Sequence, residues 1–216
     1  MSRFGARLAP VVAGSSLVLA IACDERIIPT APLTGEQCVG YPAEASSEDV
    51  LPYPVGESRL VTQGNCTNAS HQGSDKYAYD FDMPIGSEVT AIRDGVVVFV
   101  EEGFSDFDRR TLAGNVIFVL HGDGTGAEYV HLTRDGALVA VGQAVRQGEV
   151  IGLSGASGRA GSPHLHLGLL VCTETADGLD CMSLPLTFRN ASPSAPSGLR
   201  AGVSYTALPH DGPAPG

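Results

Sequence analysis

The sequence predicts a mainly β fold built from antiparallel sheets. The 216-residue chain contains 27 glycines and 14 prolines, a composition that favours many turns over long helices. Between these turns lie short segments that are rich in β-branched residues or alternate apolar with polar residues, which is typical of strands. No amphipathic window with the period of a helix interrupts them. The length accommodates one ordinary domain with flanking segments.

Residues 1–22 are predicted to be an export signal. Arg3 and Arg7 precede an apolar stretch that ends at Cys23 and is too short and too rich in small residues for a membrane span. The end of this stretch, LAIAC, resembles a lipoprotein signal, which would make Cys23 a lipid anchor; ordinary signal cleavage nearby is the alternative. Polar residues 23–51 are expected to form a tether and lead-in. The protein is therefore expected in the cell envelope, in the periplasm, or secreted.

The five cysteines agree with export into an oxidising compartment. If Cys23 carries lipid, four remain, and their order favours the pairs Cys38–Cys66 and Cys172–Cys181, although three pairings are possible. A zinc–thiolate site is a weaker reading, because the chain has no C-x-x-C.

The strands of the predicted domain, residues 52–191, follow one another closely. Residues 87–102 contain a strand, an Asp-Gly turn and a β-branched strand; further strands are predicted within 114–124, 126–132, 144–155, 163–172 and 181–190. The segment 101–114 breaks this rhythm, and is either a tolerated surface insertion or a rim of a substrate groove. The tail, residues 192–216, is rich in Pro, Ser, Gly and Ala and is expected to be disordered.

His164 and His166 share one face of a predicted strand, because residues two apart in a strand point to the same side. Leu165 and Leu167 then point into the core. Two neighbouring imidazoles suit a metal site or an acid–base pair, since histidine is the commonest side-chain metal ligand. A pair of exposed strand histidines is the alternative reading.

An upstream segment offers further ligands. His71 precedes two carboxylates: Asp75 in a Gly-Ser-Asp turn, and Asp80, which shares the polar face of a strand with Asp82. Zinc enzymes commonly use three His or carboxylate ligands and leave the fourth position for water. His131, within AEYVHL, is a candidate proton shuttle beside such a site, or else a satisfied half-buried histidine.

Other classes of function are disfavoured. The chain lacks H-E-x-x-H, G-x-S-x-G and a phosphate-binding G-x-x-x-x-G-K-[ST] motif. Its formal charge of −11 does not favour nucleic acid or anionic lipid as a partner, so contact with a membrane is expected only through the anchor at Cys23. A structural hydrogen-bonding role is expected for His121, and no role for His210.

Together these segments resemble the lysostaphin/LytM-type zinc metallopeptidases. The resemblance covers about Pro52 to Asn190 and rests on SHQG, YDFDMPIGSEVTAIRDGVV, YVHL, GEVIGLSGASG and GSPHLHLGL in this order. It implies a compact β domain with an open groove, one zinc ion, and hydrolysis of peptides of the bacterial cell wall, peptidoglycan.

The resemblance also implies residue roles. His71, Asp80 and His166 would bind zinc, and His131 and His164 would be the catalytic histidines beside the open position.

The identity of the carboxylate ligand has an alternative. The family pattern H-x-G-x-D fits His71 to Asp75 literally, but Asp80 stands at the matching distance from Gly86 and is favoured. The competing function is a catalytically silent wall-binding or regulatory module of the same fold. Such a module is expected to have lost at least one of the five positions, and all five are present.

Overall fold

The computed structural model describes residues 38–67, 69–108, 110–175 and 178–210. The expected export signal and Cys23 lie outside these residues. Within them, no helix is long and apolar enough to cross a membrane.

The described residues confirm the mainly β fold. Their strands are β1 (Ser58–Gln63), β2 (Tyr79–Asp82), β3 (Glu88–Thr90), β4 (Gly95–Glu101), β5 (Asn115–Leu120), β6 (Gly126–Ala137), β7 (Ala144–Val145), β8 (Val150–Ser154), β9 (His164–Thr175), β10 (Gly178–Ser183), β11 (Ala191–Ser192) and β12 (Ser204–Ala207). Two short 3-10 helices, η1 (Glu44–Ser46) and η2 (Gly73–Asp75), accompany them.

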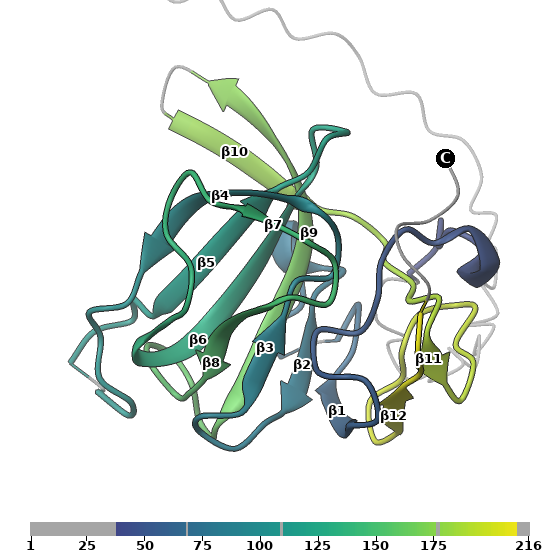
Figure 1. Ribbon diagram of the computed structural model, residues 1–216, viewed down its shortest axis with the longest axis horizontal. Coiled ribbons are helices and arrows are strands. Elements are labelled where there is room, and N and C mark those ends of the chain that lie inside the picture. Colours follow the sequence, from purple (N-terminus) through teal and green to yellow (C-terminus); the bar gives the residue numbers. More distant parts are fainter. Residues whose placement is uncertain (1–37, 68, 109, 176–177, 211–216) are drawn as a thin grey trace, which may run out of the picture. The chain divides into compact units, whose positions relative to one another are not determined.

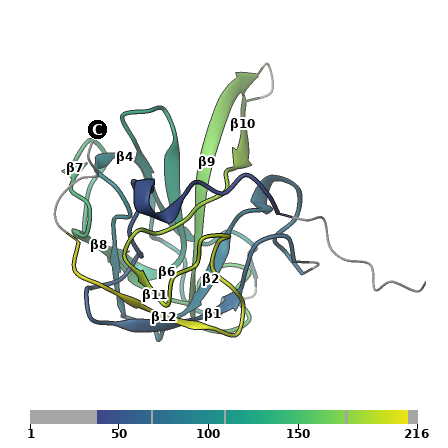
Figure 2. The ribbon, with the colours of Figure 1, turned by 90° about the vertical axis from the view of Figure 1, so that its right-hand side faces the viewer.

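The strands form one antiparallel sheet in the order β11-β12-β1-β2-β9-β6-β5-β4-β7 (Figure 1). Strand β10 pairs with the far end of β9, and β3 pairs with β8, which also pairs with β6. The hairpin of β9 and β10 projects beyond the neighbouring strands in both views (Figures 1 and 2). Strand β9 therefore lies between β2 and β6, so that the end of β9 away from β10 is in the middle of the sheet.

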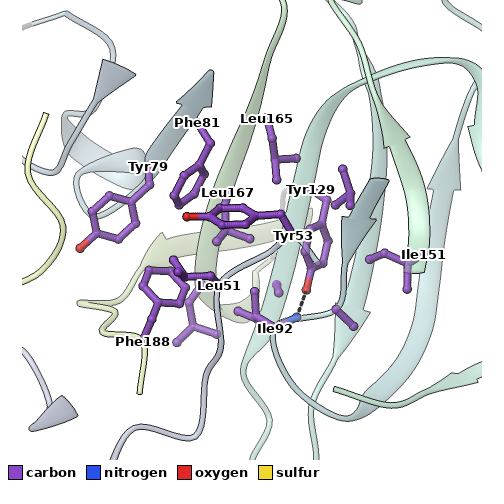
Figure 3. Close-up of a cluster of buried hydrophobic side chains, with 14 of the residues drawn as sticks. Leu51, Tyr53, Tyr79, Phe81, Ile92, Tyr129, Ile151, Leu165, Leu167 and Phe188 are labelled. Atoms are coloured by element: carbon purple, nitrogen blue, oxygen red, sulfur yellow. Dashed lines mark hydrogen bonds between the residues drawn. The ribbon is translucent and has the colours of Figure 1, made fainter. Parts of the chain in front are cut away.

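An aromatic core covers one face of the strands (Figure 3). Tyr53 packs edge-on against Phe81, with 5.6 Å between ring centroids, and Phe188 packs against Tyr79 at 5.8 Å. The buried Tyr129 hydroxyl accepts a hydrogen bond from the backbone N–H of Ile92 at 2.8 Å. Aromatic side chains bury large apolar areas, so this cluster strongly stabilises the register of the strands that carry it.

The register of β2 against β9 follows from this core. Tyr79 pairs with Leu167 and Phe81 with Leu165, and all four side chains are buried. Because successive side chains alternate between faces, the residue between Tyr79 and Phe81 must point away from the core. That residue, Asp80, lies directly opposite the β9 residue between the two leucines.

The lead-in is part of the folded unit. Val50 and Leu51 are buried, and Asp49 accepts hydrogen bonds from the Arg93 guanidinium at 2.7 and 2.9 Å. Residues 38–51 therefore form an ordered lead-in and not a tether, because a few apolar side chains and one buried ion pair hold them to the sheet. Both disulfides favoured by the cysteine order, Cys38–Cys66 and Cys172–Cys181, are present.

The expectation of a disordered tail is wrong for residues 192–210. Strand β12 pairs with β1, and β11 pairs with β12, so the tail extends the sheet. Leu199 and Tyr205 are buried, and the Tyr205 carbonyl accepts a hydrogen bond from the Tyr53 hydroxyl at 2.8 Å. The Pro/Ser/Gly/Ala-rich composition obscured these few apolar residues, which cover an otherwise open sheet edge. Residues 211–216 lie outside the described part.

We predict that Tyr205→Ala lowers the free energy of unfolding by about 3–5 kcal/mol, because it removes a fully packed aromatic side chain. Leu208→Ala, at a side chain that is 44% exposed in the same tail, should change it by less than about 1 kcal/mol. Urea denaturation of the full chain measures both values. Equal small effects would show that the tail does not contribute to the core.

Candidate metal centre

Three side chains that are distant in sequence converge on the outward face of the sheet. One ligand atom from each of His71, Asp80 and His166 lies within 4.8 Å of the others. The Asp80 Oδ1 atom is 3.2 Å from His71 Nε2 and 2.9 Å from His166 Nδ1. Ligand atoms of a tetrahedral zinc site are about 3.3 Å apart, given the usual bond lengths, so the donor types and their spacing fit zinc.

Each of these histidines is oriented through its other ring nitrogen. His71 is fully buried and donates Nδ1–H to the Gly64 carbonyl at 2.8 Å, which turns Nε2 toward Asp80. In His166 the two ring nitrogens exchange these roles: Nε2 is 3.7 Å from the Glu128 carboxylate, and Nδ1 points toward Asp80. Metal-binding histidines characteristically have such a carbonyl or carboxylate partner behind the ring.

The charges of the cluster are strongly coupled. Burial favours the neutral form of Asp80, but hydrogen bonds from His166 and His71 outweigh it and hold the pKa of this carboxyl well below its usual range. Burial likewise disfavours the charged form of His166, yet the neighbouring carboxylates of Asp80 and Glu128 raise its pKa to about 9. An ionised carboxylate held between imidazoles suits a cation, which would replace the proton on the His166 nitrogen that faces Asp80.

A second pair of histidines lies beside this cluster. The rings of His131 and His164 are 4.5 Å apart between centroids, and His164 Nε2 is 3.9 Å from Asp80 Oδ1. Each donates Nδ1–H to a backbone carbonyl, that of Ser157 at 2.9 Å and that of Ser162 at 2.8 Å. The Nε2 atoms of both rings are therefore left to exchange a proton or a hydrogen bond with a ligand.

The environment of His131 favours its neutral form. Burial, reinforced by the nearby His164 ring, lowers the pKa of His131 to about 4. A neutral imidazole with its Nδ1–H already donated has a free Nε2 lone pair, so His131 can accept a proton at neutral pH.

The backbone of β6 changes its conformation at His131. In a regular strand, His131 would point into the core with Ala127 and Tyr129. Its φ of 67° instead lies in the left-handed region and reverses the alternation. As a result Leu132 enters the core, while His131, beside Val130, lines a cavity on the outward face of the sheet.

The cavity around these histidines has a volume of about 850 Å³. It is lined by Gln63, Ala69, Ser70, Gln72, Asp75, Asp80, Glu128, Val130, His131, Arg159, Gly161, His164 and His166. Asp75 therefore lies at the cavity but outside the three-residue cluster, in the 3-10 helix η2.

Sequence reasoning missed Glu128. It pairs with Gly168 across β6 and β9, and a Cβ on Gly168 would lie 2.8 Å from Glu128 Oε1, so the carboxylate side chain crosses the space above the glycine. Its outward position beside Tyr129 was readable from strand alternation, but its contact with His166 was not. The structural role expected for His121 agrees with the hydrogen bond from its Nδ1–H to the Asp94 carbonyl at 2.9 Å.

The sequence matches one family model. Residues 74–177 match the model described as "Peptidase family M23". The match contains Asp80, His131, His164 and His166, and begins three residues after His71.

Several curated proteins and solved structures are similar to this chain. Peptidoglycan DD-endopeptidase ShyA of Vibrio cholerae is 41% identical over 103 residues, which cover 48% of this chain and 21% of that protein. Lysostaphin of Staphylococcus simulans is 35% identical over 121 residues, which cover 56% of this chain and 20% of that protein. A zinc-containing peptidase from Vibrio cholerae, known as a crystal structure, has 31% identity and a TM-score of 0.46, over 65% of this chain and 41% of that one.

The chain spans only 20–21% of the length of these two curated relatives. The resemblance to lysostaphin-type peptidases that the sequence motifs indicated is confirmed by the family match and by these relatives. The chain contains a domain of peptidase family M23, which the family model matches over residues 74–177.

Proposed function

We propose that this protein is a zinc-dependent metalloendopeptidase that hydrolyses cross-links or stem peptides of bacterial peptidoglycan. The observation that carries the proposal is the convergence of His71, Asp80 and His166 beside a second histidine pair on one face of the sheet. The relatives support the substrate class, because ShyA is named a peptidoglycan DD-endopeptidase.

In this proposal His71, Asp80 and His166 hold one zinc ion per domain. The ion would supply a Lewis acid that polarises a peptide carbonyl and makes water more acidic. The Gly64 carbonyl and the Glu128 carboxylate orient the two imidazoles, so that the three donor atoms face one point.

The second histidine pair performs the proton transfers. His131, which is neutral at neutral pH, accepts a proton from the attacking water through Nε2. His164 presents its Nε2 to the same space; with a proton on Nε2 it donates a hydrogen bond to the developing oxyanion, while the proton taken up by His131 passes to the leaving amine. The backbone carbonyls of Ser157 and Ser162 keep both rings oriented for this role.

Export fits this activity. The two disulfides belong to an oxidising compartment, which is where peptidoglycan lies. We propose that the protein acts in the cell envelope or is secreted, with Cys23 as a lipid anchor.

The competing possibility is a silent wall-binding module of the same fold. Zinc content and turnover of purified peptidoglycan, measured on the same preparation, distinguish the two, because a silent module releases no peptide.

We predict that Asp80→Ala abolishes zinc retention, because the remaining two imidazoles supply only two of the three donors. Asp75→Ala is the matched control, since Asp75 lines the same cavity without belonging to the cluster. Zinc content after dialysis, measured by atomic emission, gives the result. Loss of zinc in Asp75→Ala with retention in Asp80→Ala would transfer the ligand to Asp75.

His131→Ala and His164→Ala should each retain one zinc ion and lose about 10²–10⁴-fold in the rate of wall-peptide hydrolysis. The physical reason is that both side chains act on protons and lie outside the ligand cluster. Release of soluble peptides, followed by mass spectrometry, measures the rate. Near-normal rates in both variants would remove these residues from the mechanism.

Position 131 also permits a stability test. A residue with a Cβ is strained at a φ of 67°, whereas glycine is not. His131→Gly should therefore be more stable than His131→Ala by about 1 kcal/mol, although both lack the imidazole. Denaturation of the two zinc-loaded variants measures the difference. Greater stability of the alanine variant would contradict a left-handed backbone at this position.

A further inference from the structure

The outward face of β5 is apolar. Ile117 and Val119 point into the core, and the residues between and beyond them, Val116, Phe118 and Leu120, point outward and line a cavity. The uncovered face of an antiparallel sheet normally carries polar residues. An apolar uncovered face of this kind indicates a binding surface.

Neighbouring strands continue this surface into a hollow of about 770 Å³. We call it the apolar groove and define it by Val98, Phe99, Val116, Phe118, Leu120, Leu170 and Leu179, with the Cys172–Cys181 disulfide at its wall. Its floor is shaped by Gly126, where a Cβ would lie 2.3 Å from the Phe118 ring. The ring therefore occupies the space that a side chain at this position would need. The lining residues Cys172, Leu179 and Cys181 belong to the hairpin of β9 and β10, which projects beyond the neighbouring strands (Figure 2).

The apolar groove is continuous with the candidate metal centre. Asp75 and Glu128 line both cavities. Strand β9 runs through both, because alternate residues from His166 through Gly168 to Leu170 share its outward face. Four residues of strand span about 13 Å, so an extended peptide held at the metal centre reaches Leu170 within about four residues.

We propose that the apolar groove binds the substrate peptide on one side of the scissile bond, an inference that rests on the proposed peptidase function. It selects uncharged aliphatic side chains there and rejects acidic ones. Apolar walls favour apolar side chains and disfavour a desolvated charge. The carboxylates of Asp75 and Glu128 at the junction repel acidic residues, and none of the described residues lining the groove is basic.

The test begins with the wild-type chain and purified wall fragments, whose scissile bond is located by mass spectrometry. Synthetic peptides around that bond then carry glutamate in place of one aliphatic residue, at each position within about four residues on either side. On one side only, glutamate should lower kcat/KM by about tenfold or more.

Two variants then assign this preference to the groove. Leu179→Lys and Leu120→Lys replace side chains that are 69% and 43% exposed, so the fold should be retained. Each should raise kcat/KM for the glutamate peptide and lower it for the aliphatic one, because lysine attracts the added carboxylate. Leu138→Lys is the control, at a side chain that is 54% exposed and lines neither cavity, and should keep the wild-type preference.

Several results would overturn the inference. An unchanged preference in both lysine variants, or an equal loss on every peptide, removes the groove from specificity while leaving the peptidase function intact. Failure of the wild-type chain to cleave any wall fragment refutes the proposed function itself. A dimer in sedimentation that dissociates on Leu179→Lys assigns the groove to a second copy of this chain instead.

Discussion

The pairing of β2 with β9 is the constraint on which the candidate site depends. Tyr79 and Phe81 must face the core together with Leu165 and Leu167, and this requirement permits one register. A slip by one residue would turn Asp80 into the apolar core and expose the aromatic rings, at the cost of several buried side chains. The free energy of the core thus determines which carboxylate meets which imidazole.

The second histidine pair of the candidate site depends on a local exception to the strand pattern. His131 occupies a left-handed backbone conformation, which lets Leu132 fill the core while the imidazole reaches the outer cavity. Such strain persists only where surrounding contacts hold it. The Ser157 carbonyl, which accepts the His131 Nδ1–H, supplies one of these contacts.

The segment 101–114 stabilises the loop that carries Ser157. The Asp106 carboxylate accepts hydrogen bonds from the Ala156 backbone N–H and from the Thr133 hydroxyl, both at 2.6 Å. A Cβ on Gly155 would lie 2.4 Å from the Thr133 backbone nitrogen, so the loop and β6 approach as closely as a glycine allows. What the sequence presented as an insertion or a groove rim therefore connects to His131 through this loop, and part of the geometry of the site is determined outside the strands.

Several features were determined by the sequence itself, because they depend on periodicity and order along one segment. The shared face of His164 and His166 follows from a period of two residues, and the mainly β fold follows from repeated short strands and turns. Tertiary structure alone decided the rest. Asp80, which the sequence could only favour over Asp75, enters the three-residue cluster because β2 pairs with β9. Local patterns also do not reveal three further features: the contact of Glu128 with His166, the reversal at His131 and the burial of Tyr205. Each of these depends on partners far away in sequence.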